Sequence, residues 1–354
     1  MITNAEIAAM GADVREYLLQ PACPECGGGE NRTGCKRCRG TGRVVRGDPA
    51  YEQTRSGLVQ FGACPVKWLA TEESAAAELG TKAQDWGTAL DCLTLDESRV
   101  EDRLAVYPET YPCEPTKADP RTEKPWNNNA TFCKAWNQQA EEAGKLCFKV
   151  EVFNALRLAA QRLRDDARIA AVLEGAQYQV WVRGQWQDQA TGLIVPIKTL
   201  IDIVPAAGNG WMGESLADLK TARNASPWAW EGICFDGGYH VQGSLALALY
   251  NAVPGVQKRH LFLHVISENE PPYQTGRRVL GAELLNMAGV WWQSQMARYC
   301  QCLKTGHWPD YETGPDSHDG WTVINPKPWR EQAVMESLPA VAEARPDADL
   351  CNPN

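Results

Sequence analysis

The sequence has neither an export signal nor a long run of apolar residues. Its N-terminal residues contain no basic segment followed by an apolar stretch, which a secretory signal peptide requires. The most apolar stretch, residues 245–253, is far too short to span a bilayer. We therefore expect a soluble, cytoplasmic protein that does not act at a membrane.

Several common kinds of site are also missing from the sequence. There is no glycine-rich phosphate loop of the Walker type, so we do not expect the chain to use ATP by itself. The five histidines show no metal-binding spacing. Most of the thirteen cysteines follow no pairing pattern, which favours reduced thiols over a disulfide framework.

Positive charge is scarce in this chain. Lys and Arg number 35 against 44 Asp and Glu, which gives a net charge of −9. This deficit counts against a protein that coats nucleic acid without specificity. It does not exclude a nucleic-acid enzyme, because such enzymes concentrate cations locally while carboxylates hold metal. Six cations do gather in one stretch: Arg32, Lys36, Arg37, Arg39, Arg43 and Arg46.

The 354 residues are enough for one large α/β domain or two modest ones. We expect a small cysteine-containing module over residues 1–50, the main domain over 51–330 and a loosely attached tail over 331–354. In the main domain, residue spacing predicts helices over 151–174, 228–252 and 283–303, strands over 177–183, 193–204, 214–220 and 260–266, and a surface loop over 107–130. This order predicts a mixed central sheet flanked by helices.

Two of these strands carry the residues that we expect to perform chemistry. The segment from Leu200 to Lys220 reads as a hairpin, with Asp202 on its first strand and Asp218 and Lys220 on its second. Residues two apart on a strand share a face, so Asp218 and Lys220 point the same way. Two carboxylates can hold Mg²⁺, and a neighbouring lysine can stabilise the transition state of phosphodiester hydrolysis. The alternative for an Asp-x-Lys triplet alone is an ion pair at a strand edge.

The chain resembles the exodeoxyribonuclease VIII type of PD-(D/E)XK nuclease from about Cys64 to Trp329. The resemblance lies in short segments that occur in the family's order: WGTALD at 86–91, DDARIAAVLEG at 165–175, a strand with Trp181, IDI at 201–203, DLKT at 218–221, YHVQ at 239–242, GHWP at 306–309 and PW at 328–329. Each segment is weak alone, and the ordered set is specific.

The resemblance implies a role for each matching residue. Asp202, Asp218 and the Leu219 carbonyl would hold Mg²⁺, or Mn²⁺ in its place, and Lys220 would be the catalytic lysine. Gln242 would be the helix glutamine that borders the active site; its alternative is a surface or core-capping amide. Thr221 and Tyr239 lie in the same motifs and are further candidates for the site.

The chain departs from the family pattern at two positions. Asp91 stands where the family usually has histidine, and Gln177 aligns, within a residue or two, where it usually has glutamate. An aspartate binds magnesium well and a glutamine carbonyl binds it poorly. We expect Asp91 to be a metal ligand that offsets the lost charge at Gln177. The alternative is that Asp91 makes a local hydrogen bond or ion pair.

The N-terminal segment contains two Cys-x-x-Cys pairs, Cys23 with Cys26 and Cys35 with Cys38. Four thiolates at this spacing suit tetrahedral Zn²⁺. The alternatives are two disulfides, which a cytoplasmic location disfavours, and an iron–sulfur cluster. The basic residues Arg32, Lys36, Arg37, Arg39 and Arg43 in and after the module are candidates for gripping DNA phosphates. In the alternative interpretation the module only stabilises the fold, and its charged side chains are simply solvated.

The function that these features favour is a Mg²⁺-dependent exonuclease that resects DNA duplex ends. The resemblance further implies 5′ to 3′ polarity, a ring-like homo-oligomer, a single-strand annealing protein as partner and a phage or prophage origin, with the host cytoplasm as location. Two alternatives remain open. One is a weak or inactive nuclease fold that binds DNA or a partner protein, and the other is an endonuclease on the same core.

Overall fold

The computed structural model describes residues 1–9, 19–39, 41–71, 82–115, 120–311, 317–318, 321–322 and 327–337. The chain divides into two compact units, Met1–Trp308 and Pro309–Asn354. Among the described residues, no helix is long and apolar enough to cross a membrane.

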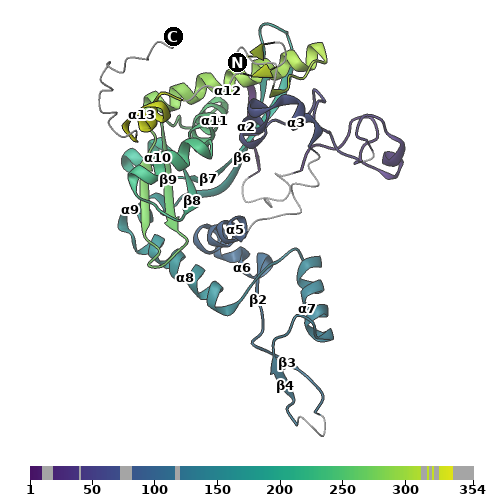
Figure 1. The fold of residues 1–354 in the computed structure, drawn as a ribbon, viewed down its shortest axis with the longest axis vertical. Coiled ribbons are helices and arrows are strands. Elements are labelled where there is room, and N and C mark those ends of the chain that lie inside the picture. The colour runs from purple at the N-terminus through teal and green to yellow at the C-terminus, as the bar shows by residue number, and fades with distance from the viewer. Residues whose placement is uncertain are drawn as a thin grey trace, which may run out of the picture. The chain divides into compact units, whose positions relative to one another are not determined.

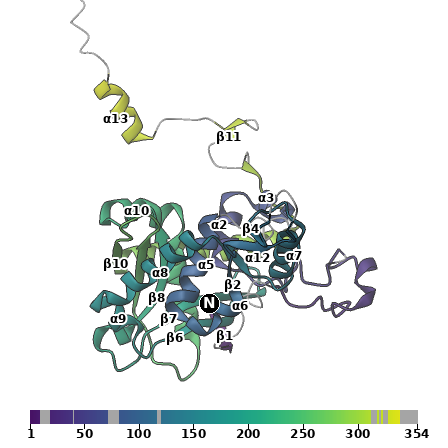
Figure 2. The same cartoon turned by 90° about the horizontal axis from the view of Figure 1, so that it is seen from below.

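The larger unit is built on a six-stranded sheet (Figures 1 and 2). Its strands run in the order β1 (Ile2–Ala9), β6 (Gln177–Gln187), β7 (Ile194–Val204), β8 (Ser215–Ala222), β9 (Leu261–Glu268) and β10 (Thr275–Val279). Neighbouring strands are antiparallel except β8 and β9, which are parallel. The predicted α/β fold with a mixed central sheet is confirmed, and the two outer strands, β1 and β10, are additions to the predicted set.

One face of the sheet is covered by α2 (Arg55–Ala63), α3 (Pro65–Ala70), α10 (Pro227–Asp236), α11 (Tyr239–Ala252) and α12 (Ala282–Thr305). Helix α11 lies across β1, β6, β7, β8 and β9 and packs against α12 on its other side. The predicted helix over 228–252 is two helices. Gly237 and Gly238 separate them, and Gly238 takes the left-handed φ of 63° that glycine tolerates without strain.

The other face is covered by α5 (Lys82–Leu95), α8 (Val150–Asp165) and α9 (Ala167–Leu173). The predicted helix over 151–174 is broken at Asp166. The Asp166 carboxylate accepts hydrogen bonds from the backbone N–H groups of Arg168 (3.0 Å) and Ile169 (3.3 Å), which starts α9 as a separate helix. Leu219 packs in this second core, so the strand alternation leaves Asp218 and Lys220 facing the opposite way.

A projecting arm lies between α5 and α8 (Figure 1). It contains η2 (Glu97–Arg99), α6 (Val100–Arg103), β2 (Leu104–Val106), β3 (Thr110–Pro112), β4 (Glu123–Pro125), α7 (Thr131–Glu142) and β5 (Leu146–Phe148). The predicted loop over 107–130 therefore contains a β3–β4 hairpin. Tyr107, Trp126 and Trp136 pack together beside it, with ring centroids 5.3–5.6 Å apart, and give the arm a small core of its own.

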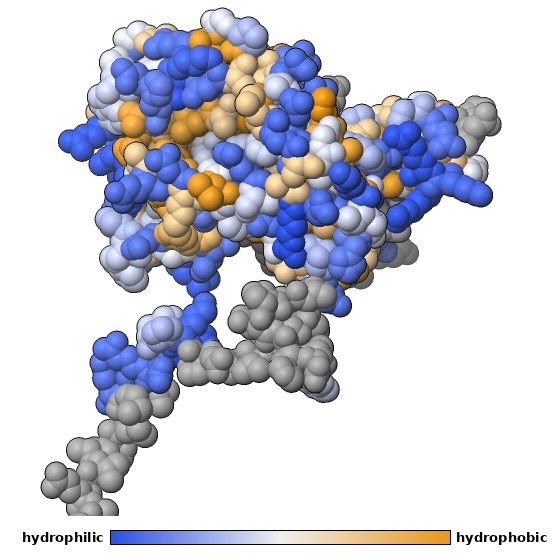
Figure 3. All heavy atoms as spheres, turned by 90° about the horizontal axis from the view of Figure 1, so that it is seen from above, coloured by the Kyte–Doolittle hydropathy of each residue, from blue (hydrophilic) through white to orange (hydrophobic). Residues whose placement is uncertain are grey.

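The cysteine module forms a lobe around η1 (Glu30–Gly34), which follows the first pair of cysteines. Figure 3 shows this lobe on the right, where its surface is mainly hydrophilic. Residues 2–9, which the sequence analysis grouped with the module, form the edge strand β1 of the central sheet. The module thus follows directly on an element of the main fold.

The described part of the smaller unit contains β11 (Ser317–His318), β12 (Trp321–Thr322) and α13 (Pro328–Ser337). The predicted tail over 331–354 begins inside α13, and its residues 338–354 lie outside the described part of the chain.

The close packing of α11 on the sheet gives a stability prediction. A Cβ at Gly243 of α11 would lie 2.9 Å from carbon atoms of Phe262 and Leu280, whereas a Cβ at Gly232 of α10 would meet no atom within 4 Å. We expect Gly243→Ala to lower the free energy of unfolding by about 1–3 kcal/mol. We expect Gly232→Ala to leave it unchanged or to raise it by up to about 1 kcal/mol. Urea denaturation measures both; equal midpoints would contradict the close approach.

Candidate active site at the opening between β7 and β8

The candidate site lies where two neighbouring strands of the sheet separate. Strands β7 and β8 are paired at Ile203 and Ala217. Directly beyond this pair, the backbone N–H of Leu219 donates to Oδ2 of Asp202 (3.2 Å) instead of to the β7 backbone. The freed edge of β7 binds an extended segment around Gln53, whose N–H donates to the Pro196 carbonyl (3.1 Å) and whose carbonyl accepts from the Lys198 N–H (2.8 Å). The sheet therefore opens beside Asp202 and Asp218.

The opening forms a pocket of about 390 Å³. It is lined by Gln20, Thr54, Arg55, Ser56, Asp91, Lys198, Thr199, Leu200, Asp202, Asp218, Leu219, Lys220 and Gln242. Six of the residues predicted from the sequence thus meet in one place: Asp91, Asp202, Asp218, Leu219, Lys220 and Gln242. They come from both faces of the sheet, since Asp91 is on α5 and Gln242 is on α11.

Asp218 is the most closely held of the pocket's carboxylates. It is 1% exposed, and it forms an ion pair with the Lys220 ammonium through Oδ2. The Gln242 side-chain amide donates to its Oδ1 (2.6 Å), so both Asp218 oxygens are engaged. Arg55 in turn donates to Oε1 of Gln242 (3.3 Å). Gln242 is therefore part of the site and not a surface amide.

Two further candidates lie beside the pocket and not in its lining. The Tyr239 ring lies 5.1 Å from the Lys220 ammonium and 5.6 Å from the Arg55 guanidinium, so it flanks both cations. Thr221 follows Lys220 on β8 and is directed at α5, where a Cβ on Gly87 would lie 3.8 Å from its hydroxyl oxygen.

The glutamine next to the site is Gln179, and not Gln177 as the alignment suggested. Gln177 is exposed at the start of β6, paired with Val204. Gln179 is buried, and its amide donates to Oδ1 of Asp202 (3.5 Å). Its backbone has a left-handed φ of 52°, which is rare for a residue with a side chain. The alternation of apolar and polar residues along a strand does not reveal such a left-handed residue. The sequence therefore could not distinguish Gln179 from Gln177.

Burial and like charges set the protonation of the carboxylates. Burial raises the pKa of Asp202 well above its usual range, and the neighbouring Asp218 raises it further. Burial also raises the pKa of Asp91 to about 7, against the opposing effect of Lys220. For Asp218 burial acts in the same direction, but Lys220 and a hydrogen bond with Asp202 hold its pKa below the usual value. Lys220 therefore pairs with only one of the three carboxylates, Asp218, and the other ammonium of the lining, that of Lys198, is paired with Glu52.

His264 is a neighbour that the sequence analysis set aside. It pairs with Asp218 across β8 and β9 and is 1% exposed. Burial lowers its pKa to about 4, and the Trp230 indole N–H donates to its Nδ1 (3.2 Å). His264 is thus neutral at pH 7 and adds no charge beside Asp218.

Arg55 is a second residue of the pocket that no sequence pattern indicated. It starts α2 directly after the N-cap Thr54 and donates to the Gly237 carbonyl (2.9 Å). The preceding Glu52 is buried and forms ion pairs with Lys198 (3.0 Å) and Arg183 (2.9 Å). This buried network fixes the segment before Arg55 against β6 and β7, so the guanidinium is held at the pocket by the sheet itself.

The four cysteines of the N-terminal module converge as predicted for a metal site. Their sulfur atoms all lie within 4.8 Å of one another, and Cys23 to Cys35 and Cys26 to Cys38 measure 3.8 and 3.6 Å. Four sulfurs at about 2.3 Å from a tetrahedral zinc ion lie about 3.8 Å apart. The thiols are not joined as disulfides, and an iron–sulfur cluster would hold them farther apart because its own atoms lie between them. The cluster therefore has the dimensions of a four-cysteine zinc site.

The basic residues of the module differ in how they are held. Arg37 forms two hydrogen bonds with the Asp48 carboxylate (2.6 and 3.0 Å), and Arg43 donates to the Gln20 carbonyl (2.8 Å). Arg32, Lys36 and Arg39 are exposed. Arg37 and Arg43 thus have structural partners.

The raised pKa of the buried Asp202 gives a prediction about pH and metal. A carboxylate whose folded pKa is raised stabilises the fold below pH 4, and that contribution is lost as the pH rises through the folded pKa. Each pH unit by which the folded pKa exceeds the unfolded pKa corresponds to about 1.4 kcal/mol. We expect Asp202→Asn to raise the melting temperature in EDTA, and the gain to grow from pH 4 towards neutrality. Mg²⁺ should stabilise the parent more than the variant. Thermal denaturation measures this.

The matched control is Asp236→Asn, which removes an exposed carboxylate of α10. Its melting temperature should follow that of the parent at every pH. An Asp202→Asn variant that melts at or below the parent in EDTA at neutral pH would contradict the electrostatic account.

Comparison with known proteins agrees with this fold. Residues 54–315 match the model of a family described as PDDEXK-like domain of unknown function (DUF3799). A candidate exonuclease from Eubacterium rectale is similar in its crystal structure, with 14% identity and a TM-score of 0.46 over 79% of this chain and 92% of that chain. No curated protein matches. The family match spans most of the chain and begins after the cysteine module, so the chain belongs to the DUF3799 family of PDDEXK-like domains.

Proposed function

We propose that this chain is a metal-dependent nuclease that hydrolyses DNA at the pocket between β7 and β8. The observation that carries the proposal is the meeting of Asp202, Asp218 and Lys220 in one pocket of a PDDEXK-like fold. Asp91 and Gln242 line the same pocket from the two faces of the sheet. These are the groups that phosphodiester hydrolysis needs: carboxylates for a metal ion and a cation for the phosphate.

The residues fit Mg²⁺, or Mn²⁺, better than a softer metal. The pocket offers carboxylates and the Leu219 carbonyl, which are hard oxygen ligands, and no described thiol lines it. Burial raises the pKa of Asp202 and Asp91, and a bound cation would favour the ionised form of both carboxylates. When bound, Mg²⁺ supplies a Lewis acid that activates water and neutralises charge on the phosphate.

The chain's own residues have distinct parts in this proposal. Asp202 and Asp218 would hold the metal, with the Leu219 carbonyl as a further ligand. Lys220, which forms an ion pair with Asp218, would supply its ammonium to the phosphate. Gln242 orients Asp218 through its amide, and Arg55 orients Gln242. Tyr239 limits the movement of Lys220, while Thr221, on the opposite side of β8, supports the packing of α5.

Asp91 and Gln179 together keep the charge of the site. The resemblance implies that the family usually has histidine at the position of Asp91 and glutamate near Gln177, and Gln179 is the glutamine of β6 that lies beside Asp202. Asp91 lines the pocket, and burial raises its pKa to about 7. A bound cation would favour its ionised form. Gln179 contacts Asp202 and contributes a neutral amide. We propose Asp91 as the ligand that compensates for Gln179.

The finer statement of the function is an exonuclease that resects duplex ends for recombination by strand annealing. The resemblance to the exodeoxyribonuclease VIII type supports it, and with it an annealing protein as partner and a ring-like homo-oligomer. We further propose that the segment around Cys23–Cys38, which comes after the sheet strand β1, is a zinc module attached to a nuclease domain that extends to about residue 330. A second candidate is a DNA-binding module with weak catalysis: the neutral amide of Gln179 contacts Asp202, near where the resemblance leads us to expect a glutamate.

Cleavage assays on linear and circular duplex DNA test these proposals. We expect the parent to degrade linear DNA with Mg²⁺ and not with EDTA, and to leave circles intact. We expect Asp218→Ala and Lys220→Ala each to reduce cleavage by at least about 100-fold, because each removes a group that acts on the metal or the phosphate. The Asp236→Asn variant should cleave as the parent does.

The same assay distinguishes the alternatives. Nicking of circles would indicate an endonuclease, and binding of DNA without any cleavage would indicate the binding module. A Lys220→Ala variant with the turnover of the parent would show that the proposed active site is wrong.

We propose that Cys23, Cys26, Cys35 and Cys38 bind one Zn²⁺. The support is the spacing of their four sulfurs, and the hydrogen bond that the Gly42 N–H donates to Sγ of Cys38 (3.4 Å). The described lobe contains few buried side chains other than these cysteines, so a metal is the main source of stability available to it.

Elemental analysis of the purified chain should find about one zinc per molecule. In Cys35→Ser we expect that zinc to be lost and the lobe to become sensitive to protease. Cys113→Ser, which removes a thiol of the arm, should keep its zinc. Iron in place of zinc, or a metal-free protein with oxidised thiols, would overturn the assignment.

A further inference from the structure

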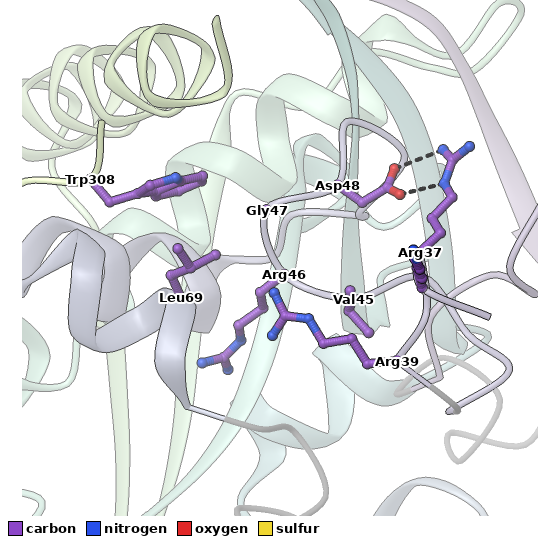
Figure 4. Close-up of a pocket in the computed structure, with 9 residues that line it drawn as sticks. Arg37, Arg39, Val45, Arg46, Gly47, Asp48, Leu69 and Trp308 are labelled. Atoms are coloured by element: carbon purple, nitrogen blue, oxygen red, sulfur yellow. Dashed lines mark hydrogen bonds and ion pairs between the residues drawn. The ribbon is translucent and has the colours of Figure 1, made fainter. Parts of the chain in front are cut away.

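A second pocket lies between the cysteine module and the main fold, with a volume of about 270 Å³ (Figure 4). It is lined by Lys36, Arg37, Arg39, Val45, Arg46, Gly47, Asp48, Leu69 and Trp308. Four cations and one carboxylate thus share a small concave surface. In a chain with a net charge of −9, this is a strong local excess of positive charge.

Two of the four cations have structural partners. Arg37 is held by the Asp48 carboxylate, and Arg46 donates to the Trp68 carbonyl (2.7 Å) and lies 5.2 Å from the Trp68 ring. These contacts fix the walls of the pocket. They also satisfy the Asp48 carboxylate, whose pKa Arg37 holds below the usual value against the effect of burial. Asp48 is therefore occupied and does not balance the remaining cations.

The other two cations, Lys36 and Arg39, are exposed and border the pocket. In Figure 4 the Arg39 side chain extends across the pocket towards Arg46. Arg39 has a left-handed backbone φ of 52°, which the turn after Cys38 imposes on it. The guanidinium groups of Arg39 and Arg46 therefore repel each other, and an anion bound between them would remove that repulsion.

We infer that this basic pocket binds the phosphate backbone of DNA outside the nuclease pocket. The inference rests on the proposed DNA substrate and extends it to a second contact. Its cations all precede residue 54, where the family match begins, so the contact is an addition to the family's fold. Lys36 and Arg39 make the phosphate contacts, while Arg37 and Arg46 position the pocket.

The two pockets are close enough for one duplex to reach both. Asp48 lines the basic pocket and Thr54 lines the nuclease pocket. Six residues of chain span at most about 22 Å. A DNA duplex rises about 3.4 Å per base pair, so this distance corresponds to about six base pairs. The two pockets are therefore no more than about six base pairs apart, and a duplex longer than that can contact both.

Fluorescence anisotropy in EDTA tests this inference without cleavage. The variant is the double substitution Lys36→Gln and Arg39→Gln, and the control is Arg157→Gln with Arg162→Gln, which removes two exposed cations of α8. For a duplex of about 24 base pairs we expect the variant to bind about 5- to 20-fold more weakly than the parent at low salt. Its slope of log affinity against log salt should fall by about two.

The other outcomes separate a failure of this inference from a failure of the proposed nuclease. Equal affinity and equal salt slope for parent and variant on the long duplex would overturn it, even if the parent cleaves DNA. If the variant keeps its DNA affinity but loses binding to polyglutamate, the pocket recognises an acidic protein instead. If the parent binds no DNA, both the proposed nuclease function and the DNA contact at the basic pocket are wrong. A parent that binds through Lys36 and Arg39 but never cleaves would remove only the nuclease. Zinc content of the variant checks that its module is folded.

Discussion

The separation of β7 from β8 is the constraint on which the rest of the site depends. A continuous ladder would pair the two strands through Asp202 and Asp218, and α5 and α11 would stay on opposite faces. Here the Leu219 N–H binds the Asp202 carboxylate, so the backbone donor is satisfied without the β7 carbonyl. The gap admits Asp91 from one face and Gln242 from the other. Asp91 and Gln242 thus reach Asp202 and Asp218 because the sheet opens, and at the opening the Asp202 carboxylate takes the place of a backbone acceptor.

Such a site is costly for the free protein. Burial disfavours the charged forms of Asp202 and Asp91, and repulsion from Asp218 adds to this effect; their raised pKa values express that cost. The surrounding core compensates for it, since Ile203, Ala217 and Leu219 pack against α5 and α8 at the same place. Lys220 and Gln242 hold Asp218 in its ionised form. A divalent cation would turn the repulsion into coordination, so function and stability meet at the same residues.

Strand alternation predicted which residues share the site but not how the strand geometry is broken. It placed Asp218 and Lys220 on one face and Leu219 on the other, and the two Cys-x-x-Cys pairs predicted a cluster with the spacing found. Strand alternation failed where the backbone departs from regular strand geometry. At Gln179 the backbone is left-handed, and the alternation of side chains along a strand does not reveal this. Arg55 was missed because its position depends on buried ion pairs of Glu52, which form only in the folded chain.

The segment from Arg46 to Arg55 joins the two halves of the proposed function. At one end Asp48 binds Arg37 of the module, and the Asp48 carbonyl accepts from the buried Tyr299 hydroxyl of α12 (3.3 Å). At the other end Glu52 is fixed to β6 and β7, directly before Arg55 reaches the pocket. One short stretch of chain is thus tied to the module, to the core and to the sheet. The cysteine module and Arg55 are thus connected to the core and to the sheet through the same short segment.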